Sequence, residues 1–380
     1  MSRESSAAVG YYGGQSFAAV VRNQGQPFTV EPVEVGAPGK GEIKVRMVGV
    51  GICHTDLVCR DAFPVPMPIV LGHEGSGVVE SVGEGVSKIR PGDHVVLSFN
   101  SCGHCHNCAH HAPAYCFQFM PLNFGGSRPA DGSSPISQHG RLIHGNFFGQ
   151  SSFATHSVAN AANAVVVDKS LPLELLGPLG CGIQTGAGAV LNSLGVSKDR
   201  SIAIFGGGAV GLSGLMAAKA VGSGAVIVIE PNQRRRDLAK EFGADLVLDP
   251  ISGIDVLAEI RAFVVGGVHR ALDTTGIPAV IGTAADSLLP NGILGLVGAS
   301  PMEATLPVNI MSMIVRGIGI KAILEGDSDP QAFIPRLLEL YSKGRFPFDK
   351  LIKTFPFQQI NEAAKATETG EVIKPVLTFS

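Results

Sequence analysis

The pattern of apolar and polar residues changes near residue 183. Before this point, short apolar runs alternate with Gly and Pro turns, which predicts a β-rich region with a Greek-key or barrel-like arrangement. Its predicted strands are residues 18–22, 29–35, 42–50, 78–82 and 94–97. Residues 120–150, rich in Gly, Ser and Pro, are predicted to form a long irregular loop.

After residue 183, apolar runs alternate with helical segments, which is typical of parallel strands joined by helices. The predicted strands are residues 201–205, 225–229, 246–248, 270–273 and 293–297, and residues 290–292 are predicted to form a turn. From about residue 323 the pattern returns to the first type, with an amphipathic helix over 332–343 and a last strand over 376–379.

These elements predict an α/β protein with two domains. The β-rich domain takes residues 17–182 and 323–380, and a doubly wound parallel sheet takes residues 183–322. Residues 1–16 are small, polar and Gly-rich, which favours a flexible N-terminal extension.

Composition narrows the class of protein. A chain of 380 residues that is 45% hydrophobic and 16% charged is globular and long enough for two or three domains. The net charge of −3, without a long charged run, gives no reason to expect binding to nucleic acid or to a membrane surface. No apolar export signal is visible, so the seven cysteines indicate a reducing compartment, and we expect a cytoplasmic protein.

Four cysteines form the strongest local signal. Cys102, Cys105, Cys108 and Cys116 have spacings of three, three and eight residues, which suits a closed site of four thiolates around one zinc ion. Two disulfides or an iron–sulfur cluster are the alternatives, and the reducing context disfavours the disulfides. The four histidines in this loop are expected to face solvent rather than to bind the metal.

A second candidate metal site is dispersed along the chain. Cys53 begins the segment Cys53-His54-Thr55-Asp56, His73 is followed by Glu74, and Cys181 lies between two glycines. Two thiolates and one imidazole would leave the fourth corner of a zinc tetrahedron open for water or substrate. The residue types alone favour a simpler interpretation, in which these are two buried cysteines and a hydrogen-bonded histidine.

A glycine-rich turn follows the strand over 201–205. Gly206-x-Gly208-x-x-Gly211 precedes a helix, and Glu230 ends the next strand, an arrangement that binds the pyrophosphate and ribose of a dinucleotide. Glu230 favours NAD over NADP because its carboxylate would repel a 2′-phosphate. Arg234–Arg236 either accept such a phosphate or form a solvated helix face, and the second interpretation is favoured.

Together, these motifs make the sequence resemble the zinc-containing medium-chain alcohol dehydrogenases from about Phe17 to Phe379. Residues 53–61, 147–153 and 173–186 resemble the aryl (benzyl) alcohol dehydrogenase branch. The resemblance implies a GroES-like catalytic domain, a Rossmann cofactor domain, two zinc ions per chain, NAD and a homodimer or homotetramer.

The resemblance also implies roles for individual residues. Cys53, His73 and Cys181 would bind the catalytic zinc ion, with Asp56 and Glu74 behind them, and Thr55 would pass on the substrate proton. The predicted cofactor contacts are His54, Thr185, Gly206, Gly208, Val210, Gly211, Glu230, Arg235 and Lys374. The predicted pocket residues are Ser98, Phe147 and Phe148. Val58 stands where many members of the family carry a histidine that ends the proton relay, so the proton must leave by another path.

The implied activity is hydride transfer between NAD and a primary aryl or allylic alcohol. A terpenoid (geraniol-type) alcohol and an S-(hydroxymethyl)glutathione adduct are the alternative substrates. A non-enzymatic zinc-binding scaffold is disfavoured because every ligand of the catalytic zinc ion is present.

Overall fold

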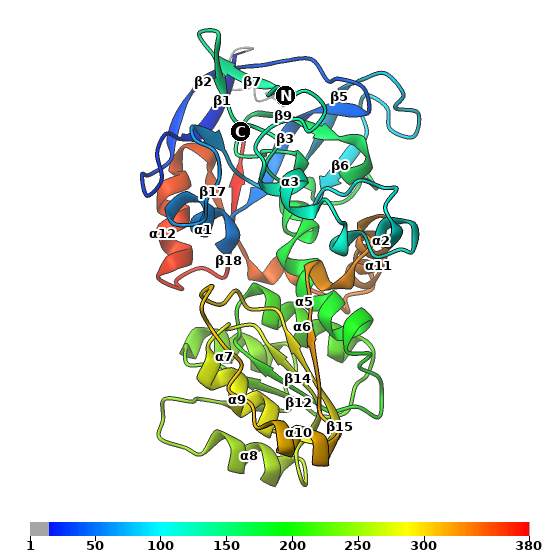
Figure 1. The fold of residues 1–380 in the computed structure, drawn as a ribbon, viewed down its shortest axis with the longest axis vertical. Coiled ribbons are helices and arrows are strands. Elements are labelled where there is room, and N and C mark those ends of the chain that lie inside the picture. The colour runs from blue at the N-terminus through cyan, green and yellow to red at the C-terminus, as the bar shows by residue number, and fades with distance from the viewer. Residues whose placement is uncertain (1–14, 380) are drawn as a thin grey trace, which may run out of the picture. The chain divides into compact units, whose positions relative to one another are not determined.

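The computed structural model describes residues 15–379, which form two compact units (Figure 1). The β-rich unit contains the described residues up to Gly103, then Gln118–Gly180 and the residues from Ile352 onward. The parallel-sheet unit contains His104–Phe117 and Cys181–Leu351. Packing thus groups residues 104–117 and 323–351 with the parallel sheet, and the domain boundaries predicted from sequence stay a prediction. The predicted extension over residues 1–16 lies outside the described residues, apart from Gln15 and Ser16.

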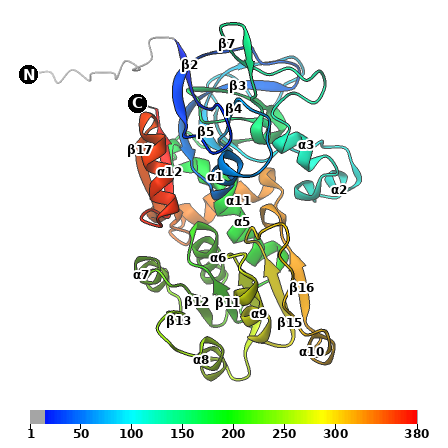
Figure 2. The ribbon, with the colours of Figure 1, turned by 60° about the vertical axis from the view of Figure 1, so that its left-hand side comes forward.

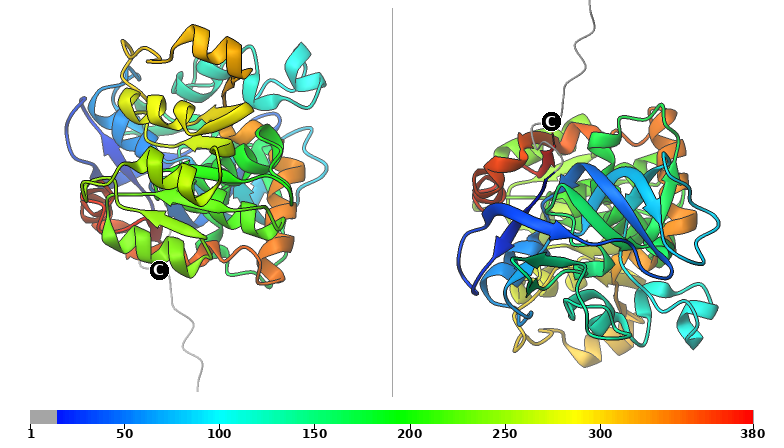
Figure 3. Two further views of the ribbon diagram at one scale, coloured as in Figure 1. Left: turned by 90° about the horizontal axis from the view of Figure 1, so that it is seen from below. Right: turned by 90° about the horizontal axis from the view of Figure 1, so that it is seen from above.

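Two sheets build the β-rich unit, which Figure 3 (right) shows end-on. The five-stranded sheet has the order β4 (Ile69–Val70), β1 (Ser16–Val21), β2 (Thr29–Val35), β7 (Ile136–Gln138) and β8 (Arg141–Ile143). The seven-stranded sheet has the order β10 (Ala164–Val167), β6 (His94–Leu97), β5 (Glu74–Val82), β3 (Glu42–Gly51), β18 (Lys374–Thr378) and β17 (Ile352–Pro356), and β9 (His156–Asn160) also pairs with β3. The helices of this unit are α1 (His54–Asp61), α3 (Phe119–Phe124), α4 (Leu173–Leu176) and α12 (Ile360–Glu368).

The prediction of an irregular loop over residues 120–150 is wrong. Helix α3 begins this stretch, and the antiparallel hairpin β7–β8 follows it. Strand β7 pairs with β2, about a hundred residues earlier, through Val35 and Ile136. Such a short strand gives almost no local signal, because its stability comes from a distant partner.

The parallel-sheet unit has six strands, all parallel, as a doubly wound fold requires. Their order is β13 (Leu246–Leu248), β12 (Val226–Ile229), β11 (Ile202–Phe205), β14 (Val268–Asp273), β15 (Leu288–Leu296) and β16 (Gly319–Ala322). The helices are α2 (His106–Ala109), α5 (Gly182–Gly188), α6 (Ala209–Ala220), α7 (Gln233–Glu241), α8 (Val256–Phe263), α9 (Pro278–Asp286), α10 (Ile310–Arg316) and α11 (Pro330–Ser342). Figure 2 shows α6 and α9 beside the strands, and buried Val, Ile, Leu and Phe side chains of the strands form the core.

Residues 290–292 are not a free turn, as the sequence predicted, but lie inside β15. The register between β14 and β15 shifts there, and Asn291 takes a left-handed backbone with φ of 60°. The turn-forming residues therefore produce an irregularity within a strand.

Across residues 15–379, none of the helices is both long and apolar enough to span a bilayer.

Candidate metal and cofactor sites

Strand β3 ends at Gly51, two residues before Cys53, the first candidate metal ligand. A Cβ atom on Gly51 would lie 2.1 Å from a carboxylate oxygen of Glu74, so only glycine allows this close passage. Cys53 follows as the N-cap of α1, and its backbone N–H donates to Asp56 Oδ2 at 2.9 Å. The helix start thus fixes the position of the Cys53 thiol.

His73 is fully buried, and its ring is held from two sides. Nδ1 lies 2.9 Å from Asp56 Oδ1, and the ring of Phe148 stacks on the imidazole with a centroid distance of 4.4 Å. Burial alone would lower the pKa of His73, but the carboxylate of Asp56 raises it well above its usual value. Nε2 is buried and has no hydrogen-bond partner. A buried nitrogen without a partner, on a ring oriented by a carboxylate, is the arrangement of a metal-binding histidine.

Cys181 is placed by its neighbour Gly180. A Cβ atom on Gly180 would lie 2.0 Å from the carbonyl oxygen of Leu97, and Ser98 Oγ donates to the carbonyl of Gly180 at 2.6 Å. The side-chain donor atoms of Cys53, His73, Glu74 and Cys181 all lie within 4.8 Å of one another. The structure therefore brings together the three predicted ligands, which sequence spacing alone did not join.

Glu74 is the fourth member of this cluster, and its charge is already matched. The Nζ of Lys374 lies 2.9 Å from both carboxylate oxygens and also donates to the carbonyl of Ile52. Burial raises the pKa of Glu74 despite this lysine. Lys374 is thus engaged by Glu74 in this structure, and its contact with the cofactor pyrophosphate stays a prediction.

One residue of the site was missed from sequence. The amide of Gln150, which is 1% exposed, donates to the carbonyl oxygens of His73 at 3.0 Å and Ser98 at 3.1 Å. It therefore ties together the backbones of two site residues. Its position after Phe147-Phe148-Gly149 was the available signal, since that segment was part of the resemblance.

The three predicted pocket residues are buried within the β-rich unit. Ser98 and Phe147 are 0% exposed and Phe148 is 3% exposed. Both phenylalanines contact Phe124, and Phe148 also takes a left-handed backbone with φ of 53°. Ser98 contributes its hydroxyl to Gly180, as described above, and the role of these residues in binding substrate stays a prediction.

The remaining predicted residues, near the start of α1, are more exposed to solvent. Thr55 is half-buried, with its hydroxyl oxygen 3.8 Å from Cys53 Sγ, and His54 is exposed. Val58 is half-buried and offers no group that could carry a proton. Thr55 therefore lies beside the sulfur of a candidate metal ligand, and its role in passing on a proton stays a prediction.

The four-cysteine loop also converges. The sulfur atoms of Cys102, Cys105, Cys108 and Cys116 lie within 4.8 Å of one another, and those of Cys105 and Cys108 are 3.5 Å apart. In the described part of the chain no disulfide joins any cysteines. Four sulfurs at such distances fit one ion with tetrahedral coordination. The four histidines of the loop are exposed, in agreement with the expectation that they face solvent.

The glycine-rich turn has the shape that a pyrophosphate needs. Gly206 has φ of +99°, and a Cβ atom on Gly211 would lie 1.9 Å from the carbonyl oxygen of Gly206. A Cβ atom on Gly208, by contrast, would meet nothing within 4 Å. The open space lies at the N-cap of α6, where helix N–H groups favour an anion.

Glu230 ends β12 beside this turn. Its Oε2 accepts from the N–H of Gly207 at 2.6 Å, and its Oε1 accepts from Asn232 at 2.8 Å. Arg236 pairs with Asp249 at 2.8 Å, whereas the Nε of Arg235 is buried without a hydrogen-bond partner. The Nη1 atom of Arg235 also lies 3.9 Å from Glu230 Oε2, and a contact between Arg235 and a cofactor stays a prediction.

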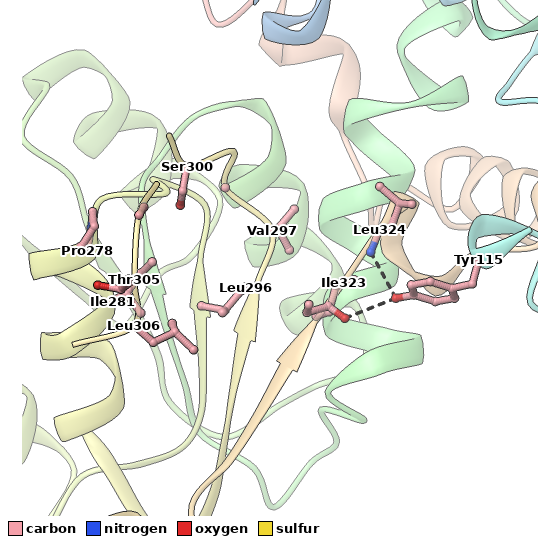
Figure 4. A pocket seen from close by; sticks show the side chains of 13 residues that line it. Tyr115, Pro278, Ile281, Leu296, Val297, Ser300, Thr305, Leu306, Ile323 and Leu324 are labelled. Carbon is pink, nitrogen blue, oxygen red and sulfur yellow. Dashed lines mark hydrogen bonds between the residues drawn. The ribbon is translucent and has the colours of Figure 1, made fainter. Parts of the chain in front are cut away.

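Two cavities open in the parallel-sheet unit. One, of about 450 Å³, lies at the carboxyl ends of β11 and β12 and is lined by Phe205, Ile229 and Pro250, among others. The other, of about 370 Å³, is lined by the ends of β15 and β16, residues 300–306 and Tyr115 (Figure 4). Ligands of doubly wound sheets bind at this edge of the strands.

Thr185 and Val210, the predicted neighbours of the nicotinamide, lie on adjacent helices. A Cβ atom on Gly186 would be 1.9 Å from the carbonyl oxygen of Val210, so α5 and α6 pack at close range. The hydroxyl of Thr185 donates to the carboxylate of Glu325 at 3.4 Å. No motif in the sequence indicated Glu325.

The geometry therefore presents a Cys₂His-type metal cluster, a four-sulfur cluster and a dinucleotide turn. Family models agree: the alcohol dehydrogenase GroES-like domain matches residues 39–169, and the zinc-binding dehydrogenase domain matches residues 209–343. The chain belongs to the zinc-type alcohol dehydrogenases, and the predicted fold class and family are confirmed.

Individual relatives are similar to this chain over nearly its whole length. A geraniol dehydrogenase of Castellaniella defragrans is 56% identical over 362 residues, which are 95% of this chain and 97% of that protein. The crystal structure of benzyl alcohol dehydrogenase from Acinetobacter calcoaceticus is 40% identical, with a TM-score of 0.93 over 96% of this chain and 99% of that one. An alcohol dehydrogenase zinc-binding domain protein from Burkholderia ambifaria is 48% identical, with a TM-score of 0.94 over 96% of this chain and 99% of that one.

Proposed function

We propose that this alcohol dehydrogenase oxidises primary alcohols with a benzylic or allylic carbinol carbon, using NAD. The observation that carries the proposal is the convergence of Cys53, His73 and Cys181, with the unpartnered Nε2 of His73 among them. This donor set fits a catalytic zinc ion with an open position. The four sulfurs of the cysteine loop fit a second, structural zinc ion.

The chain's own residues prepare the site for this reaction. A bound zinc ion would act as a Lewis acid that lowers the pKa of an alcohol hydroxyl. Asp56 holds the His73 ring so that Nε2 faces the other ligands, and Phe148 covers the face of that ring. The hydroxyl of Thr55, beside Cys53 Sγ, would accept the substrate proton, and because Val58 further along the helix cannot carry a proton, the proton would pass next to water.

NAD is the proposed cofactor because Glu230 is buried at the end of β12 and offers a carboxylate where the adenosine ribose would bind. Gly206, Gly208 and Gly211 would receive the pyrophosphate at the start of α6. We assign the adenosine to the cavity of about 450 Å³ at the ends of β11 and β12. Arg235 is the residue that would favour NADP if its guanidinium turned toward a 2′-phosphate.

The substrate class rests on the relatives. One is named a geraniol dehydrogenase and another a benzyl alcohol dehydrogenase. Geraniol is an allylic alcohol and benzyl alcohol a benzylic one, and in both cases conjugation stabilises the aldehyde product. The higher identity to the geraniol dehydrogenase makes a terpenoid alcohol as strong a candidate as an aryl alcohol. A cytoplasmic homodimer or homotetramer completes the proposal.

The test is a comparison of kcat/KM for benzyl alcohol, geraniol, ethanol and S-(hydroxymethyl)glutathione with NAD and with NADP. We expect the first two alcohols to exceed ethanol, because ethanol forgoes ~0.8 kcal/mol of burial for each missing methylene. Preference for ethanol or the glutathione adduct would refute the substrate class, and absence of turnover with every alcohol would refute the activity. Ser98→Phe tests the predicted pocket, since it should penalise benzyl alcohol more than ethanol if Ser98 lines it.

A further inference from the structure

Three adjacent strands of the parallel sheet end around one peptide group of the glycine-rich turn. Strand β11 lies between β12 and β14 and runs parallel to both. The residues that directly follow these strands are Gly206 after β11, Glu230 after β12 and Thr274 after β14. Glu230 and Thr274 therefore flank the turn from opposite sides, and no motif in the sequence indicated Thr274.

The hydroxyl of Thr274 contacts the turn on the side of β14. It donates to the carbonyl oxygens of Phe205 at 2.9 Å and Gly206 at 3.3 Å, so that one proton is shared between two acceptors. A Cβ atom on Gly206 would lie 2.4 Å from this hydroxyl oxygen. The hydroxyl thus occupies the space that a side chain at position 206 would need.

Glu230 contacts the same peptide group on the side of β12. Its carboxylate accepts from the N–H of Gly207 at 2.6 Å, and this N–H and the carbonyl of Gly206 belong to one peptide bond. A peptide between two glycines rotates easily, because neither neighbour has a Cβ atom that would limit φ and ψ. Hydrogen bonds at both of its ends therefore fix a peptide that the sequence itself leaves free to rotate.

The backbone that carries Thr274 is itself held in place. Its N–H donates to the carbonyl of Phe205 at 3.0 Å. The carboxylate of Asp273, which is 0% exposed, accepts from the N–H of Thr275 at 3.2 Å, from the hydroxyl of Thr275 at 2.7 Å and from the N–H of Gly276 at 2.9 Å. The turn after β14 is therefore fixed by a buried acid, and this keeps the Thr274 hydroxyl beside the glycines.

The orientation of the 206–207 peptide matters for anion binding at the start of α6. Gly208 is the N-cap of this helix, and the space around its Cα is open. A pyrophosphate bound there would be held by backbone N–H groups, so its binding depends on the direction in which they point. A turn that could rotate would have to be ordered when the cofactor binds, at a cost in conformational entropy.

We propose that Thr274 is a positioning residue for the cofactor: together with Glu230 it fixes the Gly206–Gly207 peptide, so that the turn is already ordered when the pyrophosphate binds. This inference rests on the proposed function, since it takes a dinucleotide as the ligand of the turn. NAD and NADP share the pyrophosphate, so loss of the Thr274 hydroxyl should weaken both by the same factor. Glu230 differs in this respect, because it is also the proposed partner of the adenosine ribose.

Three variants of the full chain test the role of the hydroxyl. Thr274→Val keeps the shape of the side chain and removes the hydroxyl, whereas Thr274→Ser keeps the hydroxyl and removes the methyl group. Thr367→Val on α12 is the matched control, because Thr367 is also half-buried and its hydroxyl donates to the carbonyl of Ala363 at 3.1 Å. Titration calorimetry gives the Kd of NAD, NADP and ADP-ribose. Displacement of ADP-ribose gives the Kd of adenosine, which lacks the pyrophosphate.

We expect Thr274→Val to weaken the binding of NAD, NADP and ADP-ribose by about 3- to 10-fold, the factor that one ordinary hydrogen bond contributes. The Kd of adenosine should stay at the parent value, and so should the ratio of the Kd values of NAD and NADP. Thr274→Ser and Thr367→Val should bind every ligand like the parent. In turnover assays, Thr274→Val should raise the KM for NAD and leave kcat at saturating NAD unchanged, because the turn does not contact the reacting atoms.

A merely structural role of Thr274 would give different results. The inference is overturned if Thr274→Val melts at a lower temperature but binds NAD and ADP-ribose as tightly as the parent. Equal weakening of adenosine and ADP-ribose also overturns it, because the hydroxyl would then support the whole edge of the sheet. So does a Thr274→Ser variant that binds as weakly as Thr274→Val, since the methyl group would then be responsible. If Thr274→Val does not fold, Thr274→Ala replaces it in the comparison with Thr274→Ser.

The parent protein distinguishes failure of this inference from failure of the proposed function. If the parent binds neither NAD nor NADP, the proposed cofactor itself is wrong. If the parent binds NAD and Thr274→Val binds it equally well, the cofactor stands and only the positioning role of Thr274 fails.

Discussion

Lys374 offers the sharpest test of how the metal cluster is built. Its ammonium lies 2.9 Å from both oxygens of Glu74, and the side chains of the two residues are 4% and 0% exposed. Lys374→Met keeps the length and the apolar stem but leaves a buried carboxylate without its counterion. Removing one partner of a buried ion pair costs about 3–5 kcal/mol, because the remaining charge stays desolvated.

The assay is urea unfolding followed by far-UV circular dichroism, since the chain has no tryptophan. Lys353→Met on the neighbouring strand β17 is the control, because that lysine is 53% exposed and pairs with Glu371 only at 3.5 Å. The control should change the free energy of unfolding by less than about 0.5 kcal/mol. The double variant Glu74→Gln/Lys374→Met should recover much of the loss, because it leaves no buried charge.

The pH dependence of Lys374→Met gives a second check. Burial already raises the pKa of Glu74, and loss of the lysine raises it further. A carboxyl group whose folded-state pKa exceeds its unfolded value is stabilising while protonated, and this stability is lost as the pH rises through the folded-state pKa. The variant should therefore lose more stability at pH 8 than at pH 5. A cost below about 1 kcal/mol at pH 8, where a broken buried pair should cost several, would refute the buried-pair reasoning.

Three further predictions test the cofactor turn and the metal sites. Glu230→Ala should lower the ratio of kcat/KM with NAD to kcat/KM with NADP by roughly tenfold, equivalent to ~1.4 kcal/mol. If the parent enzyme uses NAD and NADP equally well, the prediction is wrong and Arg235 would instead be expected to contact the 2′-phosphate. Gly211→Ala should destabilise the fold, since its Cβ would lie 1.9 Å from a carbonyl oxygen, whereas Gly208→Ala should melt like the parent but bind NAD more weakly by calorimetry. Elemental analysis should find two zinc ions per chain, and iron in place of zinc, or one ion in the parent, would contradict this. Cys102→Ser should lose one ion and thermal stability, whereas His73→Ala should lose turnover and keep the circular dichroism spectrum of the parent.

Local patterns in the sequence were enough to predict the class of fold. Strands such as 29–35, 94–97 and 246–248 appear in the structure with the predicted bounds, because a short apolar run between turn-forming residues is typical of a β-strand. The dinucleotide-binding turn was also predicted from the sequence. Gly206 and Gly211 are required there by the backbone conformation of the turn and by contacts within it. The candidate metal ligands were also present in the sequence, but their residue types alone favoured a simpler interpretation, and the resemblance to the family was needed to single them out.

Contacts between distant segments decided the rest. No local rule joins Cys53 and His73 to Cys181, because the three residues are far apart in the chain and only the folded structure brings their donor atoms within 4.8 Å. The pairing of Lys374 with Glu74 could not be predicted, because it depends on strand β18 lying beside β3. The contact of Thr274 with the glycine-rich turn likewise depends on strand β14 lying beside β11. Sequence determines which groups are available and how each short segment folds, whereas the free energy that orients these groups comes from packing against partners far away in the chain.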